Sequence, residues 1–270
     1  MPKSIAPDQG HISASVEVYE QGEATERASD QIAAECAVAL VYQGISHAVM
    51  MASPMQLEDF ALGFSLSEGI LQQASELYDL EIVEAEQGIR VEMAIASERV
   101  AALRERRRSL TGRTGCGLCG AESLTEAVRP IKPVVAPQLS ASAVQRALVA
   151  LPNHQPLQQQ TGASHAAAFC NSQGEIVLVR EDIGRHNAMD KLIGALQGST
   201  QPLSEGFALI SSRASYEMVH KSCAAGIGAL VAVSAPTAMA IDMARQAGQL
   251  LIAFARPGRH VIYHNPHGSP

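Results

Sequence analysis

The last third of this chain alternates short apolar runs with amphipathic stretches, and this alternation restricts the possible folds more than any other feature. The predicted strands and helices lie, in chain order, at 207–210, 216–225, 229–233, 238–247 and 250–254. Short apolar strands that alternate with helices are typical of βαβ units, which build a parallel sheet. Glycine, serine and proline interrupt the uncharged stretch after Lys221. A buried strand followed by a helix therefore explains this stretch better than a membrane span.

The N-terminal part predicts a mixture of hairpins and helices. Residues 1–30 are polar and aperiodic, so we predict a loose arm that ends in an edge strand near 12–19. Two hairpins are predicted, at 37–51 and at 80–95, with a helix between them at 53–69. In this helix we expect Ser53 to be the N-cap, Gln56 to complete a capping box and Gly69 to mark the end.

The predicted elements define an α/β protein of two domains joined by a loop. The expected parts are a smaller N-terminal α+β domain, a flexible CxxC loop with a linker, and a C-terminal α/β domain, over 1–110, 111–137 and 138–270. Prolines mark the linker, and Ser140 is the predicted N-cap of the helix that follows it. A strand pair at 166–179 and a helix at 188–196 then lead into the alternating region.

Charge and cysteine content narrow the functional class. The formal net charge of -7 over 270 residues argues against a general nucleic-acid-binding or membrane-surface protein. The N-terminus has no apolar segment of signal-peptide length. Five cysteines, an odd number in a chain without an export signal, indicate a reducing, cytoplasmic environment.

Cys116 and Cys119 are separated by two residues in a glycine-rich stretch. Glycine beside each cysteine indicates a mobile loop and not a packed helix or strand. Arg107, Arg108 and Arg113 are close in sequence, and positive neighbours favour the reactive thiolate. Such a pair is compatible with metal binding, dithiol redox or the carriage of a sulfur atom.

Sulfur carriage fits this pair best. A structural zinc ion needs four ligands, and the sequence has no second CxxC. A deaminase-type zinc site needs His-x-Glu before its CxxC, whereas His165 is followed by two alanines and comes after the pair. We therefore predict no metal site. A thioredoxin-like pair lies where a strand meets a helix, but this one follows a helix that we predict to begin after Ser97 and to run into the arginine cluster at 104–108. A loop that merely contains two cysteines is the remaining alternative.

A ligand-binding edge is predicted where the parallel strands end, because ligands of open α/β sheets bind beyond the carboxyl ends of the strands. The loops expected there are Ser211–Arg213, Ser234–Thr237 and 254–259. Hydroxyl groups, guanidinium groups and two helix N-termini favour a phosphorylated ligand. Alternatively, these residues are helix caps and solvated charges. No GxxxxGK[ST] motif is present, so the site is not a P-loop.

Two further features leave alternatives open. The run Glu181–Asp190 is too charged to be core throughout, so it forms either a solvated face or a site at the domain seam. His165 lies beside a predicted strand and is either a satisfied core histidine or a functional residue. Cys36, Cys170 and Cys223 have apolar neighbours in sequence, and we expect them to be inert core residues.

Several motifs occur together in this chain: GRTGCGLCG at 112–120, TGASHAA at 161–167, EDIGRHNAMDK at 181–191, SYEMV at 215–219, VSAPT at 233–237 and FARPGR at 254–259. With this set in this order, the chain resembles the formate dehydrogenase accessory sulfurtransferase (FdhD) family. The resemblance covers most of residues 35–265.

The resemblance implies an activity. The chain would receive sulfur from a cysteine desulfurase as a persulfide and pass it to the bis-molybdopterin guanine dinucleotide cofactor of molybdenum or tungsten. The cofactor would then enter the catalytic subunit of formate dehydrogenase. The family also implies a homodimer and a cytidine-deaminase-like three-layer C-terminal domain without the deaminase zinc site. A chaperone that binds the cofactor without transferring sulfur, and a zinc-binding module, are the alternatives.

The resemblance also implies roles for particular residues. Cys116 would carry the persulfide and Cys119 would assist. The cofactor-binding residues would be Phe254, Ala255, Arg256, Pro257, Gly258 and Arg259, together with Arg213, Ser234 and His165. Among them, the segment 254–259 would contact the guanine dinucleotide.

Overall fold

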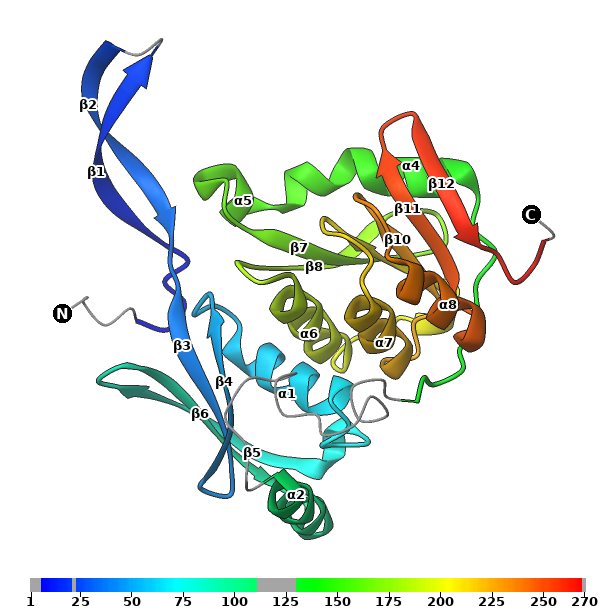
Figure 1. Ribbon diagram of the computed structural model, residues 1–270, viewed down its shortest axis with the longest axis horizontal. Coiled ribbons are helices and arrows are strands. Elements are labelled where there is room, and N and C mark those ends of the chain that lie inside the picture. Colours follow the sequence, from blue (N-terminus) through cyan, green and yellow to red (C-terminus); the bar gives the residue numbers. More distant parts are fainter. Residues whose placement is uncertain (1–5, 21–22, 111–129, 269–270) are drawn as a thin grey trace.

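The computed structural model describes residues 6–20, 23–110 and 130–268. Cys116 and Cys119 lie outside these ranges, as does Arg113. The described chain contains a six-stranded sheet, a four-stranded sheet and a separate two-stranded hairpin (Figure 1). No helix in the described ranges is long and apolar enough to cross a membrane.

The six-stranded sheet has the order β12-β11-β10-β9-β7-β8. Its strands are β7 His165–Cys170, β8 Ile176–Asp182, β9 Phe207–Ile210, β10 Ala229–Ala232, β11 Leu250–Arg256 and β12 Arg259–His264. Strands β9, β10 and β11 are parallel to one another, which confirms the parallel sheet predicted from the alternating pattern. The other neighbours pair antiparallel, and β12 was not predicted.

Helices cover both faces of this sheet (Figure 1). One face packs against α4 Ala141–Ala150, with α5 Pro156–Thr161 nearby, and the other against α6 Arg185–Leu196, α7 Tyr216–Ala224 and α8 Ala238–Ala247. Because successive residues of a strand point to opposite faces, the buried side chains of β9 divide between the two cores: Ala208 faces one and Leu209 the other. The Ser140 hydroxyl accepts a hydrogen bond from Ala143 N, which confirms the predicted cap of α4.

The second sheet has the order β4-β3-β6-β5. Its elements are β3 Cys36–Tyr42, β4 Ile45–Ala52, β5 Leu77–Ala85 and β6 Gly88–Ile95, with α1 Leu57–Ser67 against one face and α2 Ser97–Leu110 after β6. Short 3₁₀ turns occupy Ala74–Glu76, Leu151–His154 and Leu203–Glu205. Both predicted hairpins are confirmed, and the Gln43–Gly44 turn has positive φ at both residues, as a tight β-hairpin turn requires.

Helices α1 and α6 join the two sheets into one body. They cross where Gly63 of α1 and Gly194 of α6 bring the backbones together. A Cβ atom at Gly63 would collide with the Asp190 carbonyl, and one at Gly194 would collide with the Asp59 carbonyl. Only glycine permits this approach at either position, so the fit between the two halves is set by their backbones.

The prediction of a loose arm over residues 1–30 is wrong, because a second strand follows the predicted edge strand. Strands β1 His11–Glu20 and β2 Glu23–Ala33 pair antiparallel over their length and extend away from the body (Figure 1). Ser13 and Gln31 hydrogen bond across the strands, and Glu17 forms an exposed ion pair with Arg27. Cross-strand pairs of polar side chains stabilise such a ribbon without a core, which is why apolar periodicity did not reveal β2.

The predicted capping box of α1 is also wrong. The helix begins at Leu57, and Gln56 precedes it in a left-handed conformation without a side-chain cap. Ser53 lies further upstream, where its backbone N–H and its hydroxyl both donate to Asp182 of β8. Gly69, with φ +68, follows the end of the helix as predicted.

Candidate functional site

The carboxyl ends of β9, β10 and β11 form one continuous edge. Ser234 N donates to the Ser212 carbonyl at 3.3 Å, and Phe254 N donates to the Ser234 carbonyl at 3.0 Å. Ala214 also forms a parallel bridge with Pro236. The three loops predicted to meet here therefore lie side by side.

The third loop is shorter than predicted because the strand before it continues beyond Phe254 and a further strand follows. Strand β11 runs to Arg256, which pairs with Arg259 at the start of β12, and Pro257 and Gly258 form the turn between them. Gly258 N donates to Gln145 Oε1 at 2.7 Å. Both arginines are exposed. The tip of this hairpin thus presents two guanidinium groups to solvent.

Phe254 has a strained backbone at this edge. Its φ is +47, in the left-handed region that costs a bulky residue about 1–3 kcal/mol. The β11–β12 register shifts between Ala253 and Arg256, so Phe254 lies in the irregular part of the ladder. Strain of this kind persists only where the surroundings impose it, and it concentrates at binding sites.

The other two loops lead into helices whose N-termini face the same edge. Thr237 caps α8, its hydroxyl accepting a hydrogen bond from Ala240 N at 3.2 Å. Ser215 is the N-cap residue of α7, but its hydroxyl caps nothing and has no partner among the described residues. Arg213 is exposed in the loop before α7. Free N–H groups and an arginine together favour an anion.

His165 begins β7 and lies at this edge as well, because β7 runs antiparallel to β9. Its Nδ1 lies 3.3 Å from the Ser211 hydroxyl, which accepts a hydrogen bond from Ala166 N at 2.9 Å. Burial, together with the positive charges of Arg185 and His186, lowers the pKa of His165 below its usual value. The structure thus places His165 beside the ligand edge, in an electropositive environment.

The charged run Glu181–Asp190 is largely buried at the seam between the two halves, so the interpretation as a solvated face is wrong. Glu181 accepts hydrogen bonds from the backbone N–H groups of Leu157 and Gln158 at the start of α5. It also accepts one from the Ser164 hydroxyl at 2.7 Å. Glu181 therefore fixes the segment that leads into His165.

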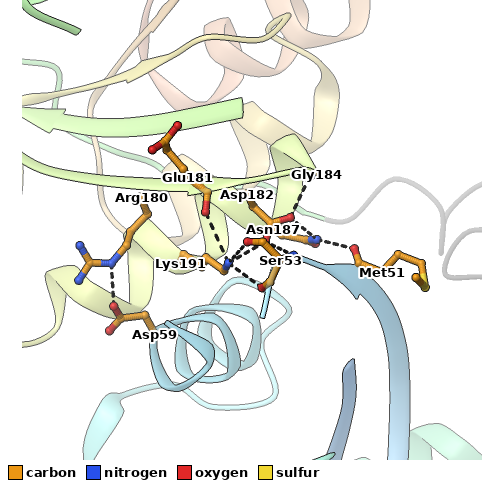
Figure 2. A network of polar contacts seen from close by, with 9 residues as sticks. All are labelled: Met51, Ser53, Asp59, Arg180, Glu181, Asp182, Gly184, Asn187 and Lys191. Carbon is orange, nitrogen blue, oxygen red and sulfur yellow. Dashed lines mark hydrogen bonds and ion pairs between the residues drawn. The ribbon is translucent and has the colours of Figure 1, made fainter. Parts of the chain in front are cut away.

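Asp182 is the centre of a buried polar network (Figure 2). Its Oδ2 lies 2.7 Å from Lys191 Nζ and accepts hydrogen bonds from Ser53 N and Ser53 Oγ. Its Oδ1 accepts from Gly184 N at 2.8 Å and from Asn187 Nδ2 at 2.9 Å. Burial lowers the pKa of Lys191, and the Asp182 carboxylate opposes that shift. The network ties β4 to the loop between β8 and α6.

A second buried network joins α1, α6 and α7. Lys221 Nζ lies 2.9 Å from Asp190 Oδ1 and 3.0 Å from Glu68 Oε1. Ser67 donates to Asp190 and accepts from Lys221. Burial raises the pKa of Asp190. The pKa of Lys221 lies above its usual value because the two carboxylates outweigh its burial.

The residues that sequence reasoning missed are Ser53, Ser67, Lys191, Lys221 and Arg185. The run of four charged residues within Glu181–Asp190 was the only local signal of a buried network. The serine partners, Ser53 and Ser67, lie more than 120 positions away in the chain, where no local pattern connects them to the run.

The described residues hold no group of three or more His, Cys, Asp or Glu side chains able to bind a metal ion. His260 and His264 of β12 have a zinc-like spacing, but His260 Nδ1 contacts Gln145 and His264 Nδ1 contacts the Gln249 carbonyl. A shallow depression of about 350 Å³ lies at the seam and is lined by Ile32, Met51, Gly184 and other residues.

Comparison with known proteins identifies the family to which this chain belongs. A description of the FdhD/NarQ family matches residues 33–269. The chain belongs to the FdhD/NarQ family. Among curated members of the FdhD/NarQ family, "Sulfur carrier protein FdhD" of Cupriavidus necator is 56% identical over 238 residues, which is 88% of this chain and 83% of that protein. The protein of the same name from Xanthomonas euvesicatoria is 48% identical over 267 residues, 98% of this chain and 94% of that protein.

A solved structure has the same fold. The crystal structure of a protein described as a formate dehydrogenase accessory protein, from Desulfotalea psychrophila, superposes with a TM-score of 0.72. It covers 95% of this chain and 98% of its own, at 21% identity. The arrangement of the two sheets around α1 and α6 is therefore shared well beyond the range of close sequence similarity.

Proposed function

We propose that this FdhD/NarQ family member is a sulfurtransferase that carries sulfur on Cys116 and delivers it to bis-molybdopterin guanine dinucleotide. The observation that carries this proposal is the extended similarity to curated sulfur carrier proteins in a chain with the Cys116–Cys119 pair. The cofactor is the substrate and then passes to formate dehydrogenase. The protein acts in the cytoplasm as a homodimer, and its six-stranded half belongs to the cytidine-deaminase-like class.

The chemistry of the carrier requires two thiols. The Cys116 thiolate attacks the terminal sulfur of a persulfide on a cysteine desulfurase, and the desulfurase cysteine leaves as a thiolate. Release of that sulfur as sulfide needs two electrons. Cys119 supplies them by forming a disulfide with Cys116, and an external dithiol reductant restores both thiols by thiol–disulfide exchange, itself becoming a disulfide. The sulfide that leaves, with the protons it takes up, replaces an oxygen ligand of the metal, which departs as water.

The ligand edge supplies the binding site for the cofactor. Arg256 and Arg259 at the hairpin tip, with Arg213 in the loop before α7, provide guanidinium groups for the diphosphate. Ser234 and the N-terminus of α8 border the same surface, and the strained Phe254 provides an aromatic ring for the guanine. The local positive charge lies on an acidic chain, so it serves this ligand and not a general polyanion.

Mass spectrometry after incubation with a cysteine desulfurase and cysteine tests the carrier step. We expect a gain of one sulfur atom on the peptide that contains Cys116 and Cys119, and no gain in Cys116→Ala. Cys36, Cys170 and Cys223 are buried and serve as internal controls. An unmodified wild-type protein, or normal formate dehydrogenase maturation by Cys116→Ala in cells without the wild type, would exclude the carrier role.

Calorimetry with guanosine diphosphate tests the nucleotide edge. Arg259→Ala should weaken binding by about tenfold or more, the usual cost of removing a hydrogen bond to a charged group. Arg245→Ala, on the exposed surface of α8, is the matched control and should bind like the wild type. A chaperone without transferase activity would bind the nucleotide but gain no sulfur, so the two experiments together separate the alternatives.

A further inference from the structure

A cationic cluster lies at the opposite end of the ligand edge from the β11–β12 hairpin. Helix α6 begins at Arg185 and His186, α7 lies beside it and begins after Ser215, and β7 begins at His165. The positive charges of Arg185 and His186 both act on His165, so the three side chains lie within electrostatic range of one another. None of them is needed for the nucleotide site at the hairpin.

Two polar atoms of this cluster are buried without partners. Arg185 Nε and Ser215 Oγ have no hydrogen-bond partner within the described part of the chain. A buried polar atom without a partner costs free energy, so such atoms are rare and need an explanation. Both Gly184 and Ser215 precede their helices without a side-chain cap, which leaves backbone N–H groups available at the same place.

The nearby carboxylates are already engaged. Glu217 pairs with His186 at 2.7 Å, and Asp182 is held by Lys191 and its other buried donors. Glu181 accepts its hydrogen bonds at the start of α5. Arg185 has no ion pair within residues 6–20, 23–110 and 130–268. Its guanidinium charge acts on the Glu217 carboxylate without forming an ion pair with it, and it lies beside two helix N-termini that have no side-chain cap.

The separation along the sheet distinguishes this cluster from the hairpin. Strands β7 and β11 are separated by β9 and β10. At about 4.8 Å per strand, His165 lies roughly 14 Å along the edge from the hairpin strand. A ligand that carries two diphosphate groups matches an edge with two anion positions better than a mononucleotide does.

We propose that Arg185, Ser215 and His165 form a second oxyanion subsite, which takes a phosphate or diphosphate group at the α6–α7 end of the edge. The Arg185 guanidinium and the Ser215 hydroxyl donate to the oxyanion, and His165 borders it. The assignment of this group to the molybdenum cofactor depends on the proposed function, whereas binding of the oxyanion itself does not.

Calorimetry with inorganic pyrophosphate tests the subsite on the full-length protein. We expect Arg185→Gln to lose one pyrophosphate site, or to weaken it by at least about tenfold, while guanosine diphosphate still binds at the hairpin. Arg259→Ala should show the reverse pattern. Arg245→Gln, on the exposed surface of α8, is the matched control and should bind both probes like the wild type.

Ser215→Ala keeps the test decisive if Arg185→Gln does not fold. Its hydroxyl makes no hydrogen bond within the described chain, so this variant should fold normally and still bind pyrophosphate several-fold more weakly. Unchanged pyrophosphate binding in both variants, or an equal loss in Arg245→Gln, would overturn the subsite. Absence of guanosine diphosphate binding in the wild type, with an Arg185-dependent pyrophosphate site retained, would instead overturn the nucleotide edge and leave the subsite standing.

Discussion

Replacement of Lys191 by methionine is the most direct test of how the two halves are held together. Lys191 and Asp182 form an ion pair at 2.7 Å in which both side chains are 0% exposed. Methionine fills nearly the same volume but carries no charge. In Lys191→Met, Asp182 therefore remains buried with its hydrogen-bond donors but without its cation.

The expected cost follows from this burial. Removal of one partner of a buried ion pair destabilises a protein by about 3–5 kcal/mol, because the remaining charge is left uncompensated. Asp182 still accepts hydrogen bonds from Ser53, Gly184 and Asn187. These donors stabilise the carboxylate in part, so we expect a value near the lower end, about 3 kcal/mol.

Urea unfolding of a double-mutant cycle measures this energy. Asp182→Asn should also destabilise the protein. The double variant should be more stable than the sum of the two single effects predicts, by at least about 1 kcal/mol, because neither charge is then left alone. Arg245→Met breaks the exposed pair with Asp242 and should cost less than about 1 kcal/mol.

Two results would refute the reasoning. If Lys191→Met cost less than about 1 kcal/mol, the pair would behave like a solvated one. If the two substitutions were additive, the charges would not be coupled, and the ion pair at the centre of the network in Figure 2 would not stabilise it.

Three further predictions concern the rest of the molecule. Gly63→Ala should unfold the protein or cost more than about 3 kcal/mol in urea unfolding, because its methyl group would collide with the Asp190 carbonyl; near-normal stability would contradict the close helix crossing. Burial and nearby positive charges lower the pKa of His165, so the unfolded state binds more protons than the folded state. The wild type should therefore lose stability as the pH falls below 6.5. His165→Gln should lose less stability over the same range, and equal losses would contradict this linkage. Burial raises the pKa of Cys170 and Cys223 to about 12. Iodoacetamide should therefore leave both thiols unmodified in the native protein and label both in urea. Labelling of either thiol in the native protein would place it on the surface.

The parts of the fold that the sequence predicts are those in which local pattern and burial coincide. Strands β9 and β10 are buried along their whole length, so each appears as a short apolar run. Helix α8 is amphipathic and capped by Thr237, so both its position and its start are visible. The convergence of their loops at one edge then follows from the parallel order alone.

The parts that the sequence could not predict depend on partners far along the chain. Ser53 before a proline has the local chemistry of an N-cap, but its partner Asp182 lies 129 positions away. Lys191 reaches Ser53 across 138 positions, and nothing near either residue indicates the other. Arg185 lies within the charged run Glu181–Asp190, but only the structure reveals that its buried Nε has no hydrogen-bond partner in the described chain.

The crossing of α1 and α6 at Gly63 and Gly194 has a consequence for the inheritance of this protein. Two sheets in one chain would ordinarily be exchangeable modules, able to recombine with other domains during evolution. Here a donor module would need a glycine at the crossing and a serine placed to meet Asp182. A half taken from an unrelated protein should therefore fail to pack against the other half.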